Sequence, residues 1–224
     1  MEGFRTIPRS KANDEPQYDD WNDSVSGVKV EIEAKFYLPS LDDIRETIKA
    51  LDGRLHAARV LERNLRFDTA DRALSSNHSL LRLRQDRSSL LTFKHAMSVE
   101  ERTEIEVGVE DFDTARALLE MLGYEVFFIY EKYRETYTLG PCRIMLDELP
   151  FGHFIEIEAD SLDEVKRTAA RLDLPWKKRV KMNYLSLFQS LKQKLKLHFR
   201  DATFDNFTGL PAVQPEDLDL KYAQ

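Results

Sequence analysis

Charged and apolar residues alternate along most of the extended segments of this chain. In residues 28–37, Glu31, Glu33 and Lys35 occupy every second position, and Ile32 and Ala34 stand between them. Successive side chains of a β-strand point to opposite faces, so the three charged residues would share one face. The pattern therefore predicts a strand with one charged and one apolar face.

The same alternation recurs in later segments of the chain. The charged positions are Arg82 and Arg84, Lys94, Arg102 with Glu104 and Glu106, Lys132 with Arg134, Arg143 with Asp147, and Glu156 with Glu158. A half-solvated antiparallel sheet alternates in a similar way, with its polar face in water. We favour charges that face inward, because nearly every polar position carries a formal charge and because helices can cover the apolar faces. The charged faces would then point at one another across a closed sheet.

The predicted elements form two similar units. The first has a strand (28–37), a helix (41–52) and strands near 60–68, 79–85 and 90–95. The second has a strand (102–108), a helix (112–122) and strands near 125–138, 141–148 and 153–159. The sequence thus predicts an α+β fold in which two β-α-β-β-β units supply eight antiparallel strands. Eight strands can close into a barrel or tunnel that holds side chains or one ligand, with the helices packed outside.

The ends of the chain differ from this central part. Residues 1–27 are polar and irregular and are predicted to form a flexible N-terminal tail. Residues 28–197, which include further helices at 161–172 and 182–197, are predicted to form the tunnel domain. Residues 198–224 are predicted to form a loop-rich C-terminal extension. Its Phe204, Phe207 and Leu210 are expected to pack on the domain, and the residues from Pro211 onward to form a tail.

Composition narrows the range of partners. The formal net charge of −7 argues against non-specific nucleic-acid binding as the main role. Cys142 is the only cysteine, so no intrachain disulfide can form and a reducing, cytoplasmic location is expected. No apolar run approaches the roughly 18 residues of a membrane span, and the N-terminus lacks the apolar core of a signal peptide. Neither nucleic acid nor a membrane is an expected partner, and the oligomeric state stays open, a homodimer included.

The segment Glu31-x-Glu33-x-Lys35 resembles the signature of the CYTH superfamily, also called triphosphate tunnel metalloenzymes. Later segments are similar to that family in the same order: Phe67-Asp68-Thr69, Leu81-Arg82-Leu83-Arg84, Leu91-Thr92-Phe93-Lys94, Arg102-x-Glu104-x-Glu106, Lys132-x-Arg134-x-x-Tyr137, Leu146-Asp147-x-Leu149 and Gly152-x-Phe154-Ile155-Glu156-Ile157-Glu158. The resemblance extends from Val28 to Leu191. It implies an eight-stranded antiparallel tunnel that binds a triphosphate and a divalent metal. Known members include inorganic tripolyphosphatases, thiamine triphosphatases, class IV adenylate cyclases and fungal RNA triphosphatases.

The chain departs from the family pattern at two places. Asn64 and Arg66 stand where relatives often carry an acidic residue and a tyrosine. Relatives often have a basic residue shortly before a tyrosine at the start of the last helix. Lys181, ahead of Tyr184, is the best match here, although Lys178 and Arg179 compete for that role.

The resemblance and the chemistry of a triphosphate together suggest roles for the charged residues. Arginine suits bidentate phosphate contacts and lysine acts as a point charge, so the expected phosphate-binding residues are Lys35, Arg82, Arg84, Lys94, Lys132, Arg134 and Lys181. Hard divalent cations prefer carboxylate oxygens, so the expected ligands of Mg²⁺ or Mn²⁺ are Glu31, Glu33, Asp147, Glu156 and Glu158. The expected catalytic residues are Lys35, Glu104 and Glu106. The two glutamates would hold a second metal or orient the attacking water.

Three functions remain open on the sequence. The leading hypothesis is metal-dependent hydrolysis of a triphosphate such as tripolyphosphate, thiamine triphosphate or a nucleoside triphosphate. The second is a class IV-type adenylate cyclase, which would make cyclic AMP and pyrophosphate from ATP. The third is a non-catalytic polyphosphate-binding module, which the many carboxylates argue against because pure anion binding would not require them.

Overall fold

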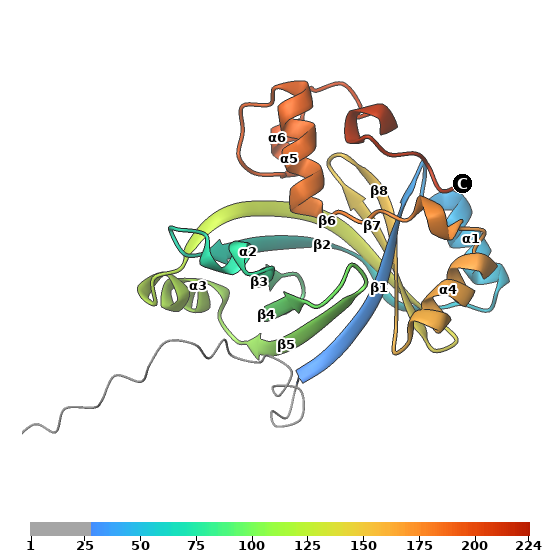
Figure 1. Ribbon diagram of the computed structural model, residues 1–224, viewed down its shortest axis with the longest axis horizontal. Coiled ribbons are helices and arrows are strands. Elements are labelled where there is room, and N and C mark those ends of the chain that lie inside the picture. Colours follow the sequence, from blue (N-terminus) through green and yellow to red (C-terminus); the bar gives the residue numbers. More distant parts are fainter. Residues whose placement is uncertain (1–27) are drawn as a thin grey trace, which may run out of the picture.

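The computed structural model describes residues 28–224 and shows a closed ring of strands with helices around it (Figure 1). The predicted N-terminal tail lies outside these residues. The eight strands are β1 (Val28–Leu38), β2 (Arg54–Asp68), β3 (Ser79–Gln85), β4 (Ser89–Ala96), β5 (Glu101–Val109), β6 (Glu125–Leu139), β7 (Cys142–Leu149) and β8 (Gly152–Ala159). The helices are α1 (Asp42–Ala50), α2 (Ala73–Ser76), α3 (Phe112–Met121), α4 (Leu162–Arg171), α5 (Tyr184–Leu195) and α6 (Phe204–Phe207). Single 3₁₀ turns span Trp176–Lys178 and Pro215–Leu218.

All neighbouring strands of the ring are antiparallel, in the order β1-β5-β4-β3-β2-β6-β7-β8. The ring closes at β1, whose first half pairs with β5 and whose second half pairs with β8. This arrangement confirms the predicted α+β fold with two β-α-β-β-β units. The strand β2 begins earlier than its sequence pattern indicates, because register shifts around Ala57 interrupt the alternation of polar and apolar residues there.

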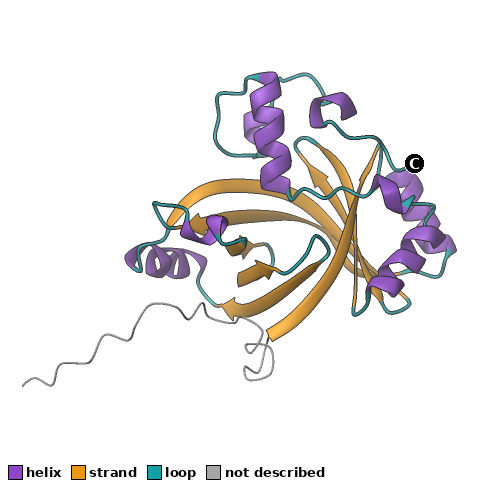
Figure 2. Cartoon of the chain, in the orientation of Figure 1, coloured by secondary structure: helices purple, strands orange, loops and turns teal. Residues whose placement is uncertain are grey.

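Helices α1, α3 and α4 cover the outer, apolar face of the ring in separate groups (Figure 2). Helices α1 and α4 pack on β1, β7 and β8, with Ile44, Ile48 and Val165 fully buried between them. Helix α3 contributes Phe112 and Leu119 to a second cluster over β2 and β3. Helix α5 packs on Phe128, Tyr130 and Phe154, which lie on the same faces of β6 and β8 as the cavity-lining Lys132 and Glu156. The prediction that the helices pack outside therefore holds for α1, α3 and α4 and needs correction for α5.

The C-terminal segment is packed onto the domain beyond Pro211, so the predicted tail is wrong. Leu218 is fully buried, and the backbone N–H of Ala223 donates to the carbonyl oxygen of Tyr37 at 2.8 Å. The ring of Tyr222 stacks on the ring of Tyr37 with centroids 4.9 Å apart. The few apolar residues in this segment do not follow the period of a strand or a helix. Their partners lie far away in the sequence, so no local pattern predicts that the segment packs on the domain.

No helix within residues 28–224 is both long enough and apolar enough to cross a membrane.

The fold predicts an unequal response of two glycines to alanine substitution. Gly152 has a φ of +142°, and a Cβ there would lie 2.5 Å from the ring of the buried Tyr37. We expect Gly152→Ala to lower the free energy of unfolding by about 2–4 kcal/mol, because strain and overpacking add. Gly140 has a φ of +60° but open space around it, so Gly140→Ala is the control and costs only about 1–2 kcal/mol. Urea unfolding measures both variants. An equal loss in the free energy of unfolding for Gly152→Ala and Gly140→Ala would contradict the close approach of Gly152 to Tyr37.

Candidate active site

A cavity of about 520 Å³ lies inside the ring of strands, and charged side chains from all eight strands line it. Its carboxylates are Glu31, Glu33, Glu62, Asp86, Glu104, Glu106, Glu156 and Glu158, and its cations are Lys29, Lys35, Arg66, Arg82, Arg84, Lys94, Arg102, Lys132, Arg134 and Arg143. Every sequence-predicted site residue except Lys181 and Asp147 lines this cavity, and Asp147 lies behind its wall in contact with Lys132 and Arg134. The charged faces of the strands meet across the closed sheet, as their alternation predicts.

Lys181 lies outside the cavity and is exposed to solvent. The preceding residue, Val180, donates its backbone N–H to the carbonyl oxygen of Lys35 at 2.7 Å, so this segment runs along the edge of β1. At the start of α5, the residues that line the cavity are Asn183, Tyr184 and Leu185. The family-based expectation for Lys181 is therefore corrected, because the path of the backbone directs this lysine to solvent.

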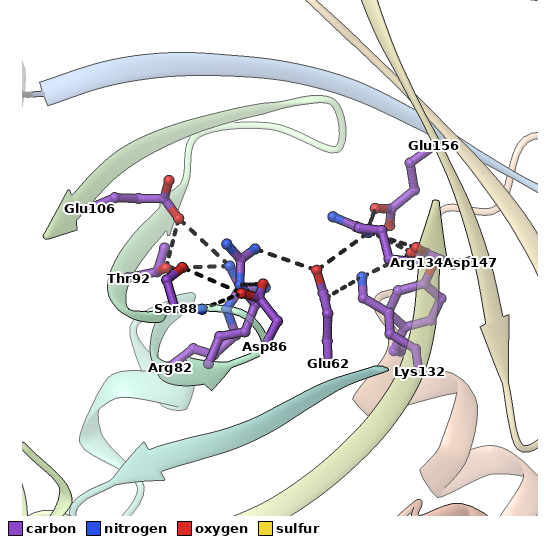
Figure 3. A network of polar contacts seen from close by, with 12 residues as sticks. Glu62, Arg82, Asp86, Ser88, Thr92, Glu106, Lys132, Arg134, Asp147 and Glu156 are labelled. Carbon is purple, nitrogen blue, oxygen red and sulfur yellow. Dashed lines mark hydrogen bonds and ion pairs between the residues drawn. The ribbon is translucent and has the colours of Figure 1, made fainter. Parts of the chain in front are cut away.

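Asp147 is fully buried and bonded to Tyr184. It holds two of the phosphate-binding candidates, Lys132 and Arg134, in place (Figure 3). Its carboxylate accepts hydrogen bonds from Lys132 Nζ at 2.9 Å, from Arg134 Nε and Nη2 at 2.6 Å each, and from the Tyr184 hydroxyl at 2.8 Å. Four donors occupy both oxygens. Asp147 therefore orients Lys132 and Arg134, and it is not free to bind a metal as the sequence led us to expect.

Glu62 is a site residue that the sequence analysis missed. It is 3% exposed and lies within 4.0 Å of the charged groups of Arg84, Lys132 and Arg134 (Figure 3). Burial alone would raise the pKa of Glu62, but Lys132 and Arg134 outweigh it and lower that pKa. The signal was present in the alternation of Glu62, Asn64 and Arg66 along β2.

Lys35 lies at the junction of β1, β8 and α5. It stands directly opposite Glu156, with its Nζ 3.1 Å from the Glu156 carboxylate and 3.7 Å from the centre of the Tyr184 ring. Glu156 also contacts Arg134. Burial raises the pKa of Glu156, yet Lys35 and Arg134 more than offset this and hold the pKa well below its usual value. The carboxylate of Glu156 is therefore ionised and keeps the two cations pointing into the cavity.

The carboxylates near the start of β1 form the acidic part of the cavity. Three cations face them: Lys94 contacts Glu31 and also Glu104 at 2.9 Å, Arg102 contacts Glu33 at 2.8 Å, and Lys29 contacts Glu158 at 2.7 Å. Glu33 and Glu158 stand directly opposite each other on β1 and β8. Burial and the neighbouring charge of Glu33 raise the pKa of Glu31 to about 7. The cations therefore do not fully balance the negative charge around Glu31.

A third group of contacts joins β3, β4 and β5. Arg82 Nη2 donates to Thr92 Oγ1 at 3.3 Å, and Thr92 donates in turn to Glu106 at 2.8 Å (Figure 3). The Glu106 side chain is 37% exposed, so water can reach it. Glu104 is less accessible and is held by Lys94.

Known proteins resemble this chain over the residues that form the ring of strands. A CYTH domain model matches residues 29–186. Adenylate cyclase CyaB from Aeromonas hydrophila is 26% identical over 137 residues, which cover 61% of this chain and 72% of the relative. Within residues 28–224, no three side chains of His, Cys, Asp or Glu are arranged so that they could together hold a metal ion.

Solved structures share the fold. The PH1819 protein of Pyrococcus horikoshii has a TM-score of 0.61 and 27% identity, with 71% of this chain and 98% of that one covered. A candidate adenylate cyclase from Vibrio parahaemolyticus has a TM-score of 0.64 at 24% identity and covers 72% and 98% of the two chains. A candidate adenylyl cyclase from Hippeastrum, described as having a dominant triphosphatase activity, has a TM-score of 0.51 at 20% identity and covers 72% and 95%. The family match spans most of the chain and coincides with the closed ring and its charged interior: the protein belongs to the CYTH domain family.

Proposed function

We propose that this protein hydrolyses a triphosphate substrate inside its cavity with the help of a divalent metal. The observation that carries the proposal is the cavity wall, where cations and carboxylates from all eight strands face one another. Stability alone does not explain so many buried charges, because removing each ion from water costs several kcal/mol. A highly charged substrate and its metal, in contrast, need both signs of charge at close range.

Six cations are the candidate phosphate ligands once Lys181 is set aside. They are Lys35, Arg82, Arg84, Lys94, Lys132 and Arg134. Phosphoryl transfer depends mainly on positioning and on neutralising the charge of the phosphoryl oxygens. The hydrogen bonds from Lys132 and Arg134 to Asp147 fix both groups before substrate arrives, so little reorganisation is needed during the reaction.

The acidic part of the cavity fits a hard cation. Glu31, Glu33, Glu156 and Glu158 lie on the adjacent strands β1 and β8 and offer carboxylate oxygens of the kind that Mg²⁺ and Mn²⁺ prefer. The raised pKa of Glu31 marks an excess of negative charge that a cation would relieve. When bound, the metal would polarise phosphoryl oxygens and neutralise part of their charge. Glu106 is the candidate for orienting the attacking water, because Thr92 fixes its carboxylate and water can reach it.

A cyclase is the second candidate, because the curated relative from Aeromonas hydrophila bears the name adenylate cyclase. In that reaction the ribose 3′-hydroxyl of ATP would attack the α-phosphate, and pyrophosphate would leave. The same cations would hold the phosphates. The two reactions are separated by incubating the protein with tripolyphosphate, thiamine triphosphate or ATP, each with Mg²⁺ or Mn²⁺. Phosphate release supports the hydrolase, cyclic AMP with pyrophosphate supports the cyclase, and the absence of both products favours a binding module.

Substitution of Lys35 tests the phosphate-binding assignment. We expect Lys35→Ala to lower turnover by about 10²–10³-fold, because a preorganised cation is lost from the transition state. Lys181→Ala is the matched control, since this lysine is exposed and outside the cavity, and it should retain turnover. Steady-state phosphate release measures both variants. Full activity of Lys35→Ala would remove the basis of the assignment.

Substitution of the two glutamates on β5 tests their proposed role. We expect Glu106→Gln to lower kcat by about 10²-fold or more, because the carboxylate that would orient water is lost. Glu104→Gln should have a smaller effect if Glu104 mainly holds Lys94. Metal titrations of both variants and of the double variant would reveal a second metal site. Unchanged turnover and metal dependence in the double variant would rule out both roles.

The electrostatics of Glu31 predict a pH-dependent stability of the metal-free protein. Its folded-state pKa of about 7 lies above the unfolded value of 4.5, so stability falls as pH rises from about 4.5 to about 7. We expect Glu31→Gln to raise the free energy of unfolding by about 1–3 kcal/mol at pH 8 and to change it little near pH 4.5. Urea unfolding in the presence of a chelator measures both. A stability difference that is the same at the two pH values would refute the buried negative charge.

The same variant tests metal binding. Added Mg²⁺ should stabilise the wild-type protein more than Glu31→Gln, because a ligand that binds only the folded state raises its stability.

A further inference from the structure

Arg66 on β2 is a buried cation that no carboxylate neutralises. Its residue is 6% exposed and its side chain lines the cavity. Lys35, Arg82 and Lys132, which are buried to a similar degree, each lie within 4.0 Å of at least one carboxylate. No such ion pair is present for Arg66 within residues 28–224, and its Nε has no hydrogen-bond partner there. The guanidinium is therefore buried without an ion pair, and Asp68 is the carboxylate whose charge acts on it from further away.

A second guanidinium stands beside Arg66 on the sheet. Arg66 lies directly opposite Arg82 on β3, and like charges in that arrangement repel. Burial lowers the pKa of Arg66, and the charge of Arg82 lowers it further, while Tyr130 and Asp68 act in the opposite direction. The Nε of Arg82 also lacks a hydrogen-bond partner. The guanidinium groups of Arg66 and Arg82 thus lie in the same part of the cavity, and the Nε–H of each donates no hydrogen bond.

Two uncharged polar side chains complete this part of the cavity. Asn64 is fully buried, and neither its amide nitrogen nor its amide oxygen makes a hydrogen bond. It stands opposite Arg84 on one side and Tyr130 on the other. Burial would raise the pKa of Tyr130, but Arg82 and Lys132 outweigh burial and lower it. The local field therefore favours negative charge. We call Asn64, Arg66, Arg82 and Tyr130 the anion corner.

A purely structural role for Arg66 is a weaker explanation. The guanidinium lies 5.5 Å from the centre of the Phe127 ring, and a contact of this type contributes about 0.5–2 kcal/mol. It leaves the buried Nε–H without a hydrogen-bond acceptor. Removing the charged group from water costs several kcal/mol, so the ring alone does not account for a buried arginine at this position.

We propose that the anion corner binds a fourth anionic group, so that the preferred substrate is a polyphosphate with at least four phosphoryl groups. The inference rests on the proposed function, in which the six candidate cations hold three phosphoryl groups. Arg82 belongs to both sets, so it would lie between the third phosphoryl group and the fourth, and Arg66 is the cation that the fourth group adds. Arg66 lies four residues beyond Glu62 on β2, about 13 Å further along the strand than the cluster around Lys132 and Arg134. A longer chain reaches this cation while its other end stays on Lys35 and Arg134.

Isothermal titration calorimetry with inorganic polyphosphates of defined length tests the proposal. Pyrophosphate, tripolyphosphate and tetrapolyphosphate would be titrated into the full chain with a chelator present, so that metal-dependent turnover cannot consume them. We expect the wild-type protein to bind tetrapolyphosphate about tenfold or more tightly than tripolyphosphate, because a charge-assisted contact is gained. Arg66→Met should reduce this ratio to about one and leave tripolyphosphate affinity within about threefold of the wild type.

Arg63→Met is the matched control. Arg63 lies on the same strand but is exposed on the outer face, so the preference for tetrapolyphosphate should remain. Equal affinity of the wild-type protein for three and four phosphoryl groups would overturn the inference and leave the proposed function intact. Failure to bind any of these polyphosphates would overturn both.

The stability of Arg66→Met separates a ligand-binding role from a structural one. Removal of an unneutralised buried charge should raise the urea midpoint of the ligand-free protein. A lowered midpoint with an unchanged ratio of tetrapolyphosphate to tripolyphosphate affinity would assign Arg66 to structure and refute its role in binding.

Discussion

The neutralisation of charge inside a closed ring of strands is the constraint on which this structure depends. Charges removed from water must find partners at short range, because solvation no longer stabilises them. Asp147 shows how this is met: it is bonded to Tyr184 and takes hydrogen bonds from Lys132 and Arg134. The ring brings carboxylates and cations from different strands within reach of one another. The fold and the charged interior therefore depend on each other. The closed ring places the charges in pairs, and the pairing offsets the cost of burying them.

Most charges of the cavity are matched, and the exceptions mark where ligands are expected. Glu31 lies among carboxylates that Lys94 and Arg102 balance only in part, and Arg66 lies opposite Arg82 and forms no ion pair with any carboxylate of residues 28–224. The first site suits a cation and the second an anion. A substrate that combines a divalent metal with a phosphate chain would satisfy both at once. The charge of the cavity is thus unevenly distributed: the part near β1 and β8 is acidic, and the part near β2 and β3 is basic.

The period-two pattern was enough to predict the ring and most of its interior. Strands such as β1 and β8 are regular, so Glu33 and Glu158 could be placed on the same face as their neighbours from spacing alone. Glu62 was missed although its strand alternates, because the bulges before Val60 obscure where that strand begins. Lys181 and Asp147 were misjudged for another reason. Their positions depend on how the segment before α5 crosses β1 and on how Tyr184 covers β7, and these are contacts between distant parts of the chain.

The way the ring closes also bears on how the chain folds. Each β-α-β-β-β unit gives its first strand to the other: β1 lies between β5 and β8, and β5 lies between β1 and β4. Neither unit can complete its own sheet, so half of the chain would expose unpaired strand edges and a face of uncompensated charge. Pairing of β1 with β8 must join residues more than a hundred positions apart, and such contacts form slowly. The exchange of first strands makes the two halves a single cooperative unit, in which the cavity exists only after the whole ring has assembled.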